Sequence, residues 1–154
     1  MNLEGKNIIL TGGSLGIGKE TAKSLINKGA NVLVTGRSEE RLIRTIKYTK
    51  SKIIEFDIGD IENISLNAKK CIEILDNRVD VLINNAGYGI GGFFEDLSED
   101  EIRSQFETNF FGVQKVTRSA LPLMRYTASK SEKEFSTKII NISSAQGRSS
   151  LPGL

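Results

Sequence analysis

The feature that most constrains this chain is the glycine-rich turn TGGSLGIG at residues 11–18, which joins the apolar run 8–10 to a helix-like stretch. Gly12, Gly16 and Gly18 remove side chains where a bound diphosphate would come close. The helix that follows offers unpaired N–H groups and a positive dipole end to phosphates. The spacing differs from both GxGxxG and the P-loop pattern. The turn therefore predicts a phosphate-binding site at the carboxyl end of the first strand.

Short apolar runs alternate with longer amphipathic stretches along the rest of the chain, which is typical of βαβ units. The predicted strands are residues 7–10, 32–34, 52–56, 79–83 and 139–142. Residues 81–83 are apolar at successive positions, as in strands covered by helices on both faces. We therefore expect an α/β fold with a doubly wound parallel sheet, and one domain over residues 1–154.

Helix boundaries are marked by glycine and serine. Gly29 is expected to end the first helix, and Ser38 and Ser98 to begin later ones, with Ser98 and Glu101 forming a capping box. The longest predicted helix covers about residues 99–125.

Asn109 falls on the apolar face of that long helix. The apolar positions of this face are Ile102, Phe106, Val113, Val116 and Ala120. A buried amide without partners costs about 1 to 3 kcal/mol, so Asn109 is expected to be hydrogen-bonded. The sequence pattern alone leaves open whether it is a satisfied core amide or part of a site.

Composition excludes several function classes. Histidine is absent and Cys71 is the one cysteine, which excludes a disulfide framework, zinc sites of histidine or several cysteines, and Ser-His or Cys-His nucleophiles. The net charge is +2 with scattered lysines and arginines, so no nucleic-acid partner is indicated. No apolar segment is long enough for a membrane span or a signal sequence, and we expect a cytoplasmic protein.

Four motifs occur in a family-typical order: TGGSLGIG, NNAG at residues 84–87, ETNFFG around Asn109, and IINISS at 139–144. NNAG by itself is ordinary turn chemistry. Together, the four motifs resemble the short-chain dehydrogenase/reductase family over Lys6 to Leu154. The resemblance implies a Rossmann-type sheet of order 3-2-1-4-5 with ligand at the carboxyl ends of the strands.

The resemblance also implies a set of cofactor-binding residues: the diphosphate beside the turn, the adenine beside an acid and an isoleucine, and the ribose beside NNAG. These residues are Gly12, Gly13, Ser14, Leu15, Gly16, Ile17 and Gly18, then Asp57 and Ile58, and then Asn85, Ala86 and Gly87.

Cofactor choice depends on the end of the second strand, where NAD-binding folds place a carboxylate for the ribose 2′-hydroxyl. This chain has Thr35, Gly36 and Arg37 there instead. Arg37 can pair with a 2′-phosphate and stack on adenine, so we favour NADP over NAD.

The family's reaction moves a hydride between nicotinamide and a small-molecule carbonyl or alcohol. By motif position, Ser144 is the catalytic serine and Asn109 the asparagine. The family's YxxxK motif would stand about a dozen residues beyond Ser144, which is past Leu154. We therefore expect the catalytic Tyr and Lys to be absent and this chain alone to turn over little.

A YxxxK-like string, YTASK at Tyr126 to Lys130, does occur, but it precedes the fifth strand. We expect it to be a decoy in an exposed, insertion-like loop at residues 126–138, near the amino-terminal edge of the sheet. No metal site is predicted.

Two other functions stay open: a non-catalytic dinucleotide-binding sensor or partner subunit, and a methyltransferase-like nucleotide fold. Tyr88, Ile90, Phe93 and Phe94 suggest an apolar wall for a lipid-like, steroid-like or retinoid-like carbonyl, although core packing explains them equally well. A homo-oligomer is also left open.

Overall fold

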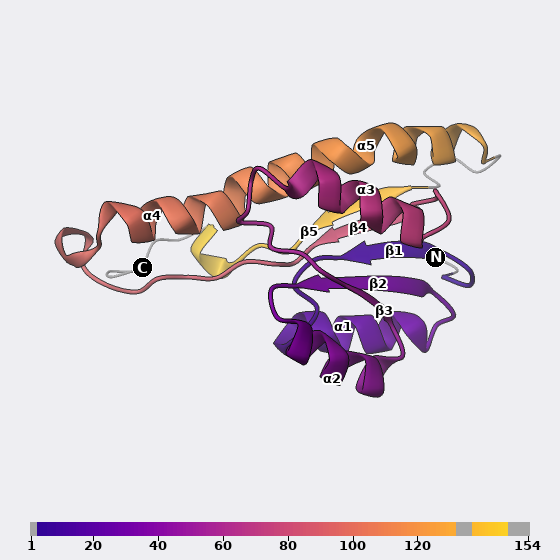
Figure 1. The fold of residues 1–154 in the computed structure, drawn as a ribbon, viewed down its shortest axis with the longest axis horizontal. Coiled ribbons are helices and arrows are strands. Elements are labelled where there is room, and N and C mark those ends of the chain that lie inside the picture. Colours follow the sequence, from indigo (N-terminus) through magenta and orange to yellow (C-terminus); the bar gives the residue numbers. More distant parts are fainter. Residues whose placement is uncertain (1–2, 132–136, 148–154) are drawn as a thin grey trace.

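The structure, a computed structural model, describes residues 3–131 and 137–147 (Figure 1). Within these residues, five parallel strands form one sheet of order β3-β2-β1-β4-β5, as predicted. The strands are β1 (Asn7–Leu10), β2 (Asn31–Gly36), β3 (Lys52–Glu55), β4 (Val81–Asn84) and β5 (Lys138–Asn141). The order reverses beside β1, so a crevice is expected at the carboxyl ends of the strands next to this point.

Helices cover both faces of the sheet (Figure 1). One side carries α1 (Gly16–Ile26) and α2 (Glu39–Thr49), and the other carries α3 (Ile64–Ile74) and α5 (Val113–Ser129). Between β4 and α5 lie the short η1 (Phe94–Asp96), α4 (Glu99–Phe106) and the π-helical turn η2 (Glu107–Gly112), and η3 (Ala145–Gly147) follows β5. No helix in the described part of the chain is long and apolar enough to cross a membrane.

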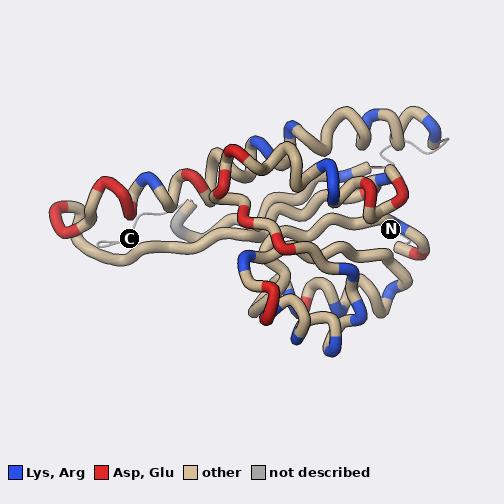
Figure 2. Tube along the Cα trace, in the orientation of Figure 1, with Lys and Arg blue, Asp and Glu red and all other residues tan. Residues whose placement is uncertain are grey.

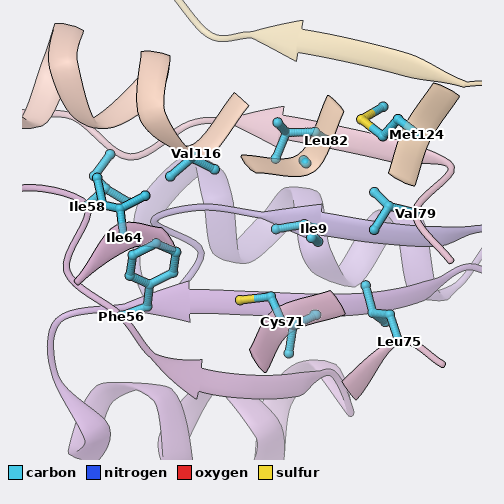
Figure 3. Packing of buried hydrophobic residues seen from close by; sticks show 12 residues of the cluster. Ile9, Phe56, Ile58, Ile64, Cys71, Leu75, Val79, Leu82, Val116 and Met124 are labelled. Atoms are coloured by element: carbon cyan, nitrogen blue, oxygen red, sulfur yellow. The ribbon is translucent and has the colours of Figure 1, made fainter. Parts of the chain in front are cut away.

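Alternate residues of each strand supply the two halves of the core, because successive side chains point to opposite faces. Ile9 and Leu82 pack with Cys71 of α3 and Val116 of α5 (Figure 3). Their strand neighbours, such as Ile8, join the second cluster with residues of α1 and α2. The apolar runs of β1, β2 and β4 are therefore buried on both sides, whereas β5 at the end of the strand order is exposed.

The predicted helix starts are confirmed. Ser38 accepts a hydrogen bond from the Arg41 N–H at the start of α2, and Ser98 and Glu101 form a complete capping box at the start of α4. Gly29 has a φ of +82°, but α1 ends earlier, at Ile26, so the glycine serves the turn into β2 rather than the helix end itself.

The long helix predicted over residues 99–125 is interrupted, because η2 inserts a π turn between α4 and α5. A π turn contains more residues than an α turn and therefore rotates the following side chains about the axis. Thr108 and Gly112 become the buried residues of this segment, while Asn109 is exposed. The prediction that Asn109 lies on the buried face was wrong for this reason.

The prediction of a loop over residues 126–138 was also wrong for its first residues. Tyr126 belongs to the last turn of α5, which continues to Ser129, and the Ser129 hydroxyl donates to the Tyr126 carbonyl. Residues 132–136 of the expected loop lie outside the described part of the chain.

Candidate functional site

A hollow of about 370 Å³ lies at the carboxyl ends of the strands beside the point where the strand order reverses. The turn after β1, the start of α2, the end of β3 and the turn after β4 all contribute to it. Its lining is Gly12, Ser14, Leu15, Gly16, Ile17, Gly18, Gly36, Arg37, Ser38, Arg41, Phe56, Asp57, Ile58, Asn85, Ala86, Gly87, Tyr88 and Thr108. The structure thus brings together all the predicted cofactor-binding residues except Gly13.

Three glycines of the turn, Gly12, Gly13 and Gly18, leave no space for a side chain, whereas nothing lies within 4 Å of a Cβ added at Gly16. Gly12 has a φ of +66°, and a Cβ there would lie 2.6 Å from the Cα of Ala86. A Cβ on Gly18 would collide with the carbonyl oxygen of Gly12. Gly13 instead faces the core, where a Cβ would lie 2.7 Å from Cγ1 of Val34, and it serves the packing beneath the hollow.

The first turn of α1 opens onto this hollow without a side-chain cap. Leu15 occupies the N-cap position, its side chain accepts no hydrogen bond, and the first turn carries no acid. The N–H groups at this end therefore remain suited to an external anion. Ile17, which is 72% exposed, lines the hollow on the same turn.

Thr11 ties the glycine turn to the NNAG turn, a role that was not predicted from the sequence. Its Oγ1 accepts hydrogen bonds from the N–H groups of Asn85 at 3.0 Å and Ala86 at 3.1 Å. The Asn85 side chain in turn donates to the carbonyls of Thr11 and Gly12, both at 3.0 Å. A polar residue directly after a buried strand was the available signal. These bonds fix the two turns at a constant separation.

Two cations line the side of the hollow formed by β2 and α2. Arg37 follows β2 and lies 5.9 Å from the centroid of the Tyr88 ring, and Arg41 lies on the first turn of α2. Figure 2 shows Lys and Arg residues along α2, whose first turn also carries the acids Glu39 and Glu40, whereas Asp and Glu gather at the start of α4. Arg41 was missed from the sequence, although its place in the first turn after the predicted start of α2 was a usable signal.

Asp57 lines the hollow just after β3, the strand that pairs with β2. Its carboxylate accepts a hydrogen bond of 2.8 Å from the N–H of Gly59, which holds the loop in a turn. Thr108 of η2 lies next to this loop: a Cβ on Gly59 would come within 2.8 Å of its hydroxyl. Thr108 also lines the hollow and was not predicted.

A second hollow, of about 760 Å³, contains both predicted catalytic residues, Asn109 and Ser144. It shares five lining residues with the first hollow: Ile17, Asn85, Ala86, Gly87 and Tyr88. The two hollows therefore meet along a common wall, and a ligand can extend from Arg37 past Ile17 toward Ser144.

Both polar groups of the Asn109 side chain are hydrogen-bonded to the loop after β4. Its Oδ1 accepts from the Tyr88 N–H at 3.0 Å, and its Nδ2 donates to the Tyr88 carbonyl at 2.6 Å. Asn109 thus has the partners that an amide requires, although they lie at the surface and not in the core.

Asn84 forms the buried floor beside this second hollow. Its Nδ2 donates to Asn141 Oδ1 at 2.8 Å and to Thr117 Oγ1 at 3.0 Å, so it links β4 to β5 and α5. Its Oδ1 is buried without a hydrogen-bond partner in the described part of the chain.

The predicted apolar wall is present only in part. Tyr88 and Ile90 line the second hollow. Phe93 and Phe94, which are 65% and 80% exposed, line neither hollow, so their assignment to the wall was wrong. They lie beyond the loop that Asn109 holds, in and beside η1.

Tyr126 and Lys130 lie in a different place from Ser144. They line a hollow of about 410 Å³ together with Lys6 and Asp80, which directly precede β1 and β4. This is the amino-terminal edge of the parallel sheet, whereas Ser144 follows the carboxyl end of β5. The YTASK string is therefore remote from the second hollow.

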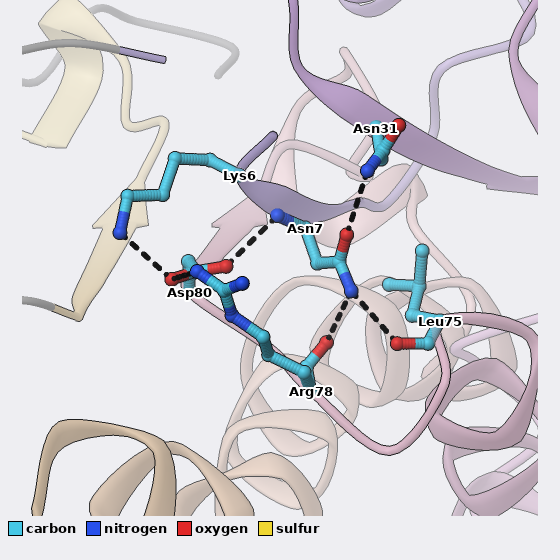
Figure 4. A network of polar contacts seen from close by, with 6 residues as sticks. All are labelled: Lys6, Asn7, Asn31, Leu75, Arg78 and Asp80. Atoms are coloured by element: carbon cyan, nitrogen blue, oxygen red, sulfur yellow. Dashed lines mark hydrogen bonds and ion pairs between the residues drawn. The ribbon is translucent and has the colours of Figure 1, made fainter. Parts of the chain in front are cut away.

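Asp80 is the centre of a polar network at that amino-terminal edge (Figure 4). Its side chain is 1% exposed and pairs with Lys6 at 2.9 Å and Arg78 at 2.8 Å. Burial by itself raises the pKa of Asp80, but the hydrogen bond from the Asn7 N–H and the two cations outweigh it and hold the pKa below its usual value.

The remaining candidate groups carry no reactive chemistry. Burial raises the pKa of the Cys71 thiol to about 12, so the sulfur stays protonated and unreactive at neutral pH. Among residues 3–131 and 137–147, no three His, Cys, Asp or Glu side chains come together to hold a metal ion.

The family model for short chain dehydrogenase matches residues 6–154. Together with the sheet order and the motif positions, this match shows that the chain belongs to the short-chain dehydrogenase/reductase family of oxidoreductases.

Individual relatives agree with this placement. The chain is 38% identical over 148 residues to a 3-ketodihydrosphingosine reductase of Bacteroides thetaiotaomicron, covering 94% of this chain and 49% of the relative. It is 34% identical over 151 residues to the ketoacyl reductase HetN of Nostoc, covering 95% and 50%. A crystal structure of a short-chain dehydrogenase from Streptomyces avermitilis superposes with a TM-score of 0.86 at 34% identity, over 99% of this chain and 54% of that one. The chain thus spans about half the length of the relatives it matches.

Proposed function

We propose that this chain is the dinucleotide-binding part of an NADP-dependent oxidoreductase that transfers a hydride between the nicotinamide and a carbonyl or alcohol substrate. The observation that carries the proposal is the common wall of the two hollows, which joins the cations Arg37 and Arg41 to the polar residues Asn109 and Ser144. NADP has the same two-ended character, with the 2′-phosphate of its adenosine at one end, the reacting nicotinamide ring at the other and the diphosphate between them.

The residues of the first hollow fit NADP in shape and charge. Gly12 allows the glycine turn to pack directly against Ala86, the open space beside Gly16 leaves room for a diphosphate, and the uncapped start of α1 supplies N–H donors. Arg37 and Arg41 provide the charge for a 2′-phosphate, and the hollow has no acid at the end of β2 to oppose it. Asp57 and Ile58 would flank the adenine, and Asn85, Ala86 and Gly87 the ribose.

Bound NADPH supplies the hydride. In the second hollow, the Ser144 hydroxyl would donate a hydrogen bond to the substrate oxygen and hold the carbonyl in position. Asn109, whose side chain is used by Tyr88, would act by fixing the loop that forms the wall between the two hollows.

The substrate we propose is an apolar ketone or the corresponding alcohol. Ile90, Val113 and Ile142 give the second hollow an apolar surface around Ser144. Two relatives are named as a ketoacyl reductase and a 3-ketodihydrosphingosine reductase, which supports our proposal of a lipid-like ketone.

We further propose that residues 1–154 alone turn over little. Among the described residues, no tyrosine–lysine pair lies beside Ser144, and Tyr126 lines the hollow at the opposite edge. A proton-transferring group typically contributes about 10² to 10⁴ in rate. Its absence would leave cofactor binding intact.

The test is to titrate the chain with NADPH and NADH and to follow NADPH oxidation with a ketone substrate. We expect tighter binding of NADPH and little turnover. Failure to bind either nucleotide would refute the proposal, and equal affinities would refute the preference for NADP. Fast turnover that Tyr126→Phe abolishes would refute the assignment of Tyr126 as a bystander. Binding without turnover even when the downstream half of a relative is fused would favour a sensor.

A further inference from the structure

Gln105 is a half-buried side chain of α4 that the proposed function does not use. It stands four residues before Asn109, and both side chains contact the loop after β4. Gln105 also lines the second hollow, together with Ile90 and Ser144. Its polar end group therefore lies in a largely apolar wall.

The amides of Gln105 and Asn109 differ in what they leave available. Asn109 uses both its oxygen and its nitrogen on Tyr88. Gln105 uses only its oxygen, because Oε1 accepts from the Ile90 N–H at 2.6 Å. A backbone N–H can only donate, so this contact fixes which end of the Gln105 amide faces the loop.

The nitrogen end of Gln105 is then directed away from the Ile90 N–H. Within the part of the chain that the structure describes, Nε2 of Gln105 has no hydrogen-bond partner. An amide nitrogen carries two N–H donors, and a donor left unpaired under an apolar ligand is costly. A site with such a donor favours a ligand that supplies an acceptor.

We propose that Gln105 is a specificity-determining residue that selects ketones carrying a second hydrogen-bond acceptor. Its Oε1 holds the Ile90 N–H, and its Nε2 donates to that second acceptor, for example an ester or thioester carbonyl. This inference rests on the proposed function, because the second hollow must be the substrate site.

Two methyl ketones of equal heavy-atom number provide the probes: ethyl acetoacetate, which has an additional ester carbonyl, and methyl hexyl ketone, which has none. Their affinities for the chain loaded with NADP⁺ are measured by ligand-observed NMR titration. The oxidised cofactor cannot reduce a ketone, so only binding is recorded. We expect the wild-type chain to prefer ethyl acetoacetate by about tenfold, the effect of one hydrogen bond.

Two substitutions separate selection from loop positioning. Gln105→Glu keeps an acceptor for the Ile90 N–H but removes the donor, and Gln105→Met removes both. In both variants the preference for ethyl acetoacetate should disappear, while the affinity for methyl hexyl ketone stays within about twofold in Gln105→Glu. Hydrogen exchange at the Ile90 amide should stay slow in Gln105→Glu and become fast in Gln105→Met.

The proposal is overturned if the NADP-loaded wild-type chain shows no preference between the probes or binds neither. It is also overturned if the preference survives in Gln105→Glu, because Gln105 would then only position the loop. If Gln105→Glu does not fold, a preference retained in Gln105→Met overturns it equally. Failure of the wild-type chain to bind NADP⁺ is a separate result and counts against the proposed function itself.

Discussion

The two edges of the parallel sheet have opposite polar chemistry. At the amino-terminal edge, the buried Asp80 carboxylate is matched by Lys6, Arg78 and the N–H of Asn7. At the carboxyl edge, α1 begins without a side-chain cap beside a turn in which Gly12 and Gly18 leave no space for a Cβ. The amino-terminal edge, which we call the paired edge, stabilises the fold by internal pairing. The carboxyl edge, which we call the open edge, leaves donors and space for a ligand.

The same contrast separates the YTASK string from the predicted catalytic serine. Tyr126 and Lys130 match a family pattern by letter but lie at the paired edge, whereas Ser144 lies at the open one. Position in the fold decides between them, because only the open edge shares a wall with the glycine turn. The role of a motif therefore depends on which end of a strand carries it.

The largest effect is expected from Gly12→Ala. The φ of +66° strains an alanine, and its Cβ would collide with Ala86, so we expect a loss of roughly 2 to 5 kcal/mol in unfolding free energy. NADPH affinity should fall about a hundredfold in the folded protein, because the turn is displaced. Urea unfolding and NADPH titration measure both effects.

Gly5→Ala is the matched control for this substitution. Gly5 has nearly the same φ, +65°, but nothing lies within 4 Å of an added Cβ. It should lose only about 1 to 2 kcal/mol and bind NADPH normally. Similar NADPH affinities in the two variants would mean that the close contact between the turns has no role in binding.

Asp80→Ala tests the paired edge. Removing the carboxylate leaves the buried Asn7 N–H without its partner and ends both ion pairs, so we expect a loss of about 3 kcal/mol in unfolding free energy. NADPH affinity should not change in the folded protein. Glu62→Ala, at an exposed acid, is the control and should change neither quantity. Loss of NADPH binding in folded Asp80→Ala would contradict the separation of the two edges.

Arg37→Ala tests the open edge, and its expected effect is on nucleotide affinity and is smaller than the effects of Gly12→Ala and Asp80→Ala. NADPH binding should weaken by about 1.5 to 3 kcal/mol, as for a hydrogen bond to a charged group, and NADH binding should hardly change. Arg44→Ala removes a neighbouring cation of α2 that does not line the hollow, and it should leave both affinities intact. Equal losses for the two nucleotides in Arg37→Ala would refute the role assigned to Arg37.

The smallest effect is a pH dependence of stability. The folded-state pKa of Asp80 lies below its unfolded value of about 3.9, so its contribution is present above that pH and is lost as pH falls through the folded pKa. Hydrogen bonds with Ser98 also lower the pKa of Glu101, which adds to the same slope. Urea midpoints between about pH 5 and pH 3 should therefore fall more steeply for the wild type than for Asp80→Asn. Identical slopes would show that folding does not lower the pKa of Asp80.

Sequence patterns predicted most of the fold, because the apolar runs and the helix caps are local signals. The capping box at Ser98 and the burial of residues 81–83 on both faces needed no tertiary information. The π turn did need tertiary information, because nothing in ETNFFG breaks the helical period. For this reason the prediction placed Asn109 on the wrong face.

The residues of the candidate site also fall into those that local sequence indicates and those that depend on tertiary packing. The glycine turn and Arg37 stand directly after buried strands, where sequence position indicates function. Arg41, Thr108 and Gln105 reach the hollows from helices, and their contribution depends on how those helices pack. Phe93 and Phe94 show the converse, since being close in sequence to Ile90 did not bring them into the wall.

The most direct test of the account is an NMR titration of the isotope-labelled chain with NADPH, which reads each backbone amide separately. We predict saturable binding, with the largest shifts at the amides of residues 12–18 and 85–87 and none at Asp80 or Tyr126. Saturation without shifts in the glycine turn, or shifts centred on the amino-terminal edge of the sheet, would contradict the claim that the open edge holds the dinucleotide.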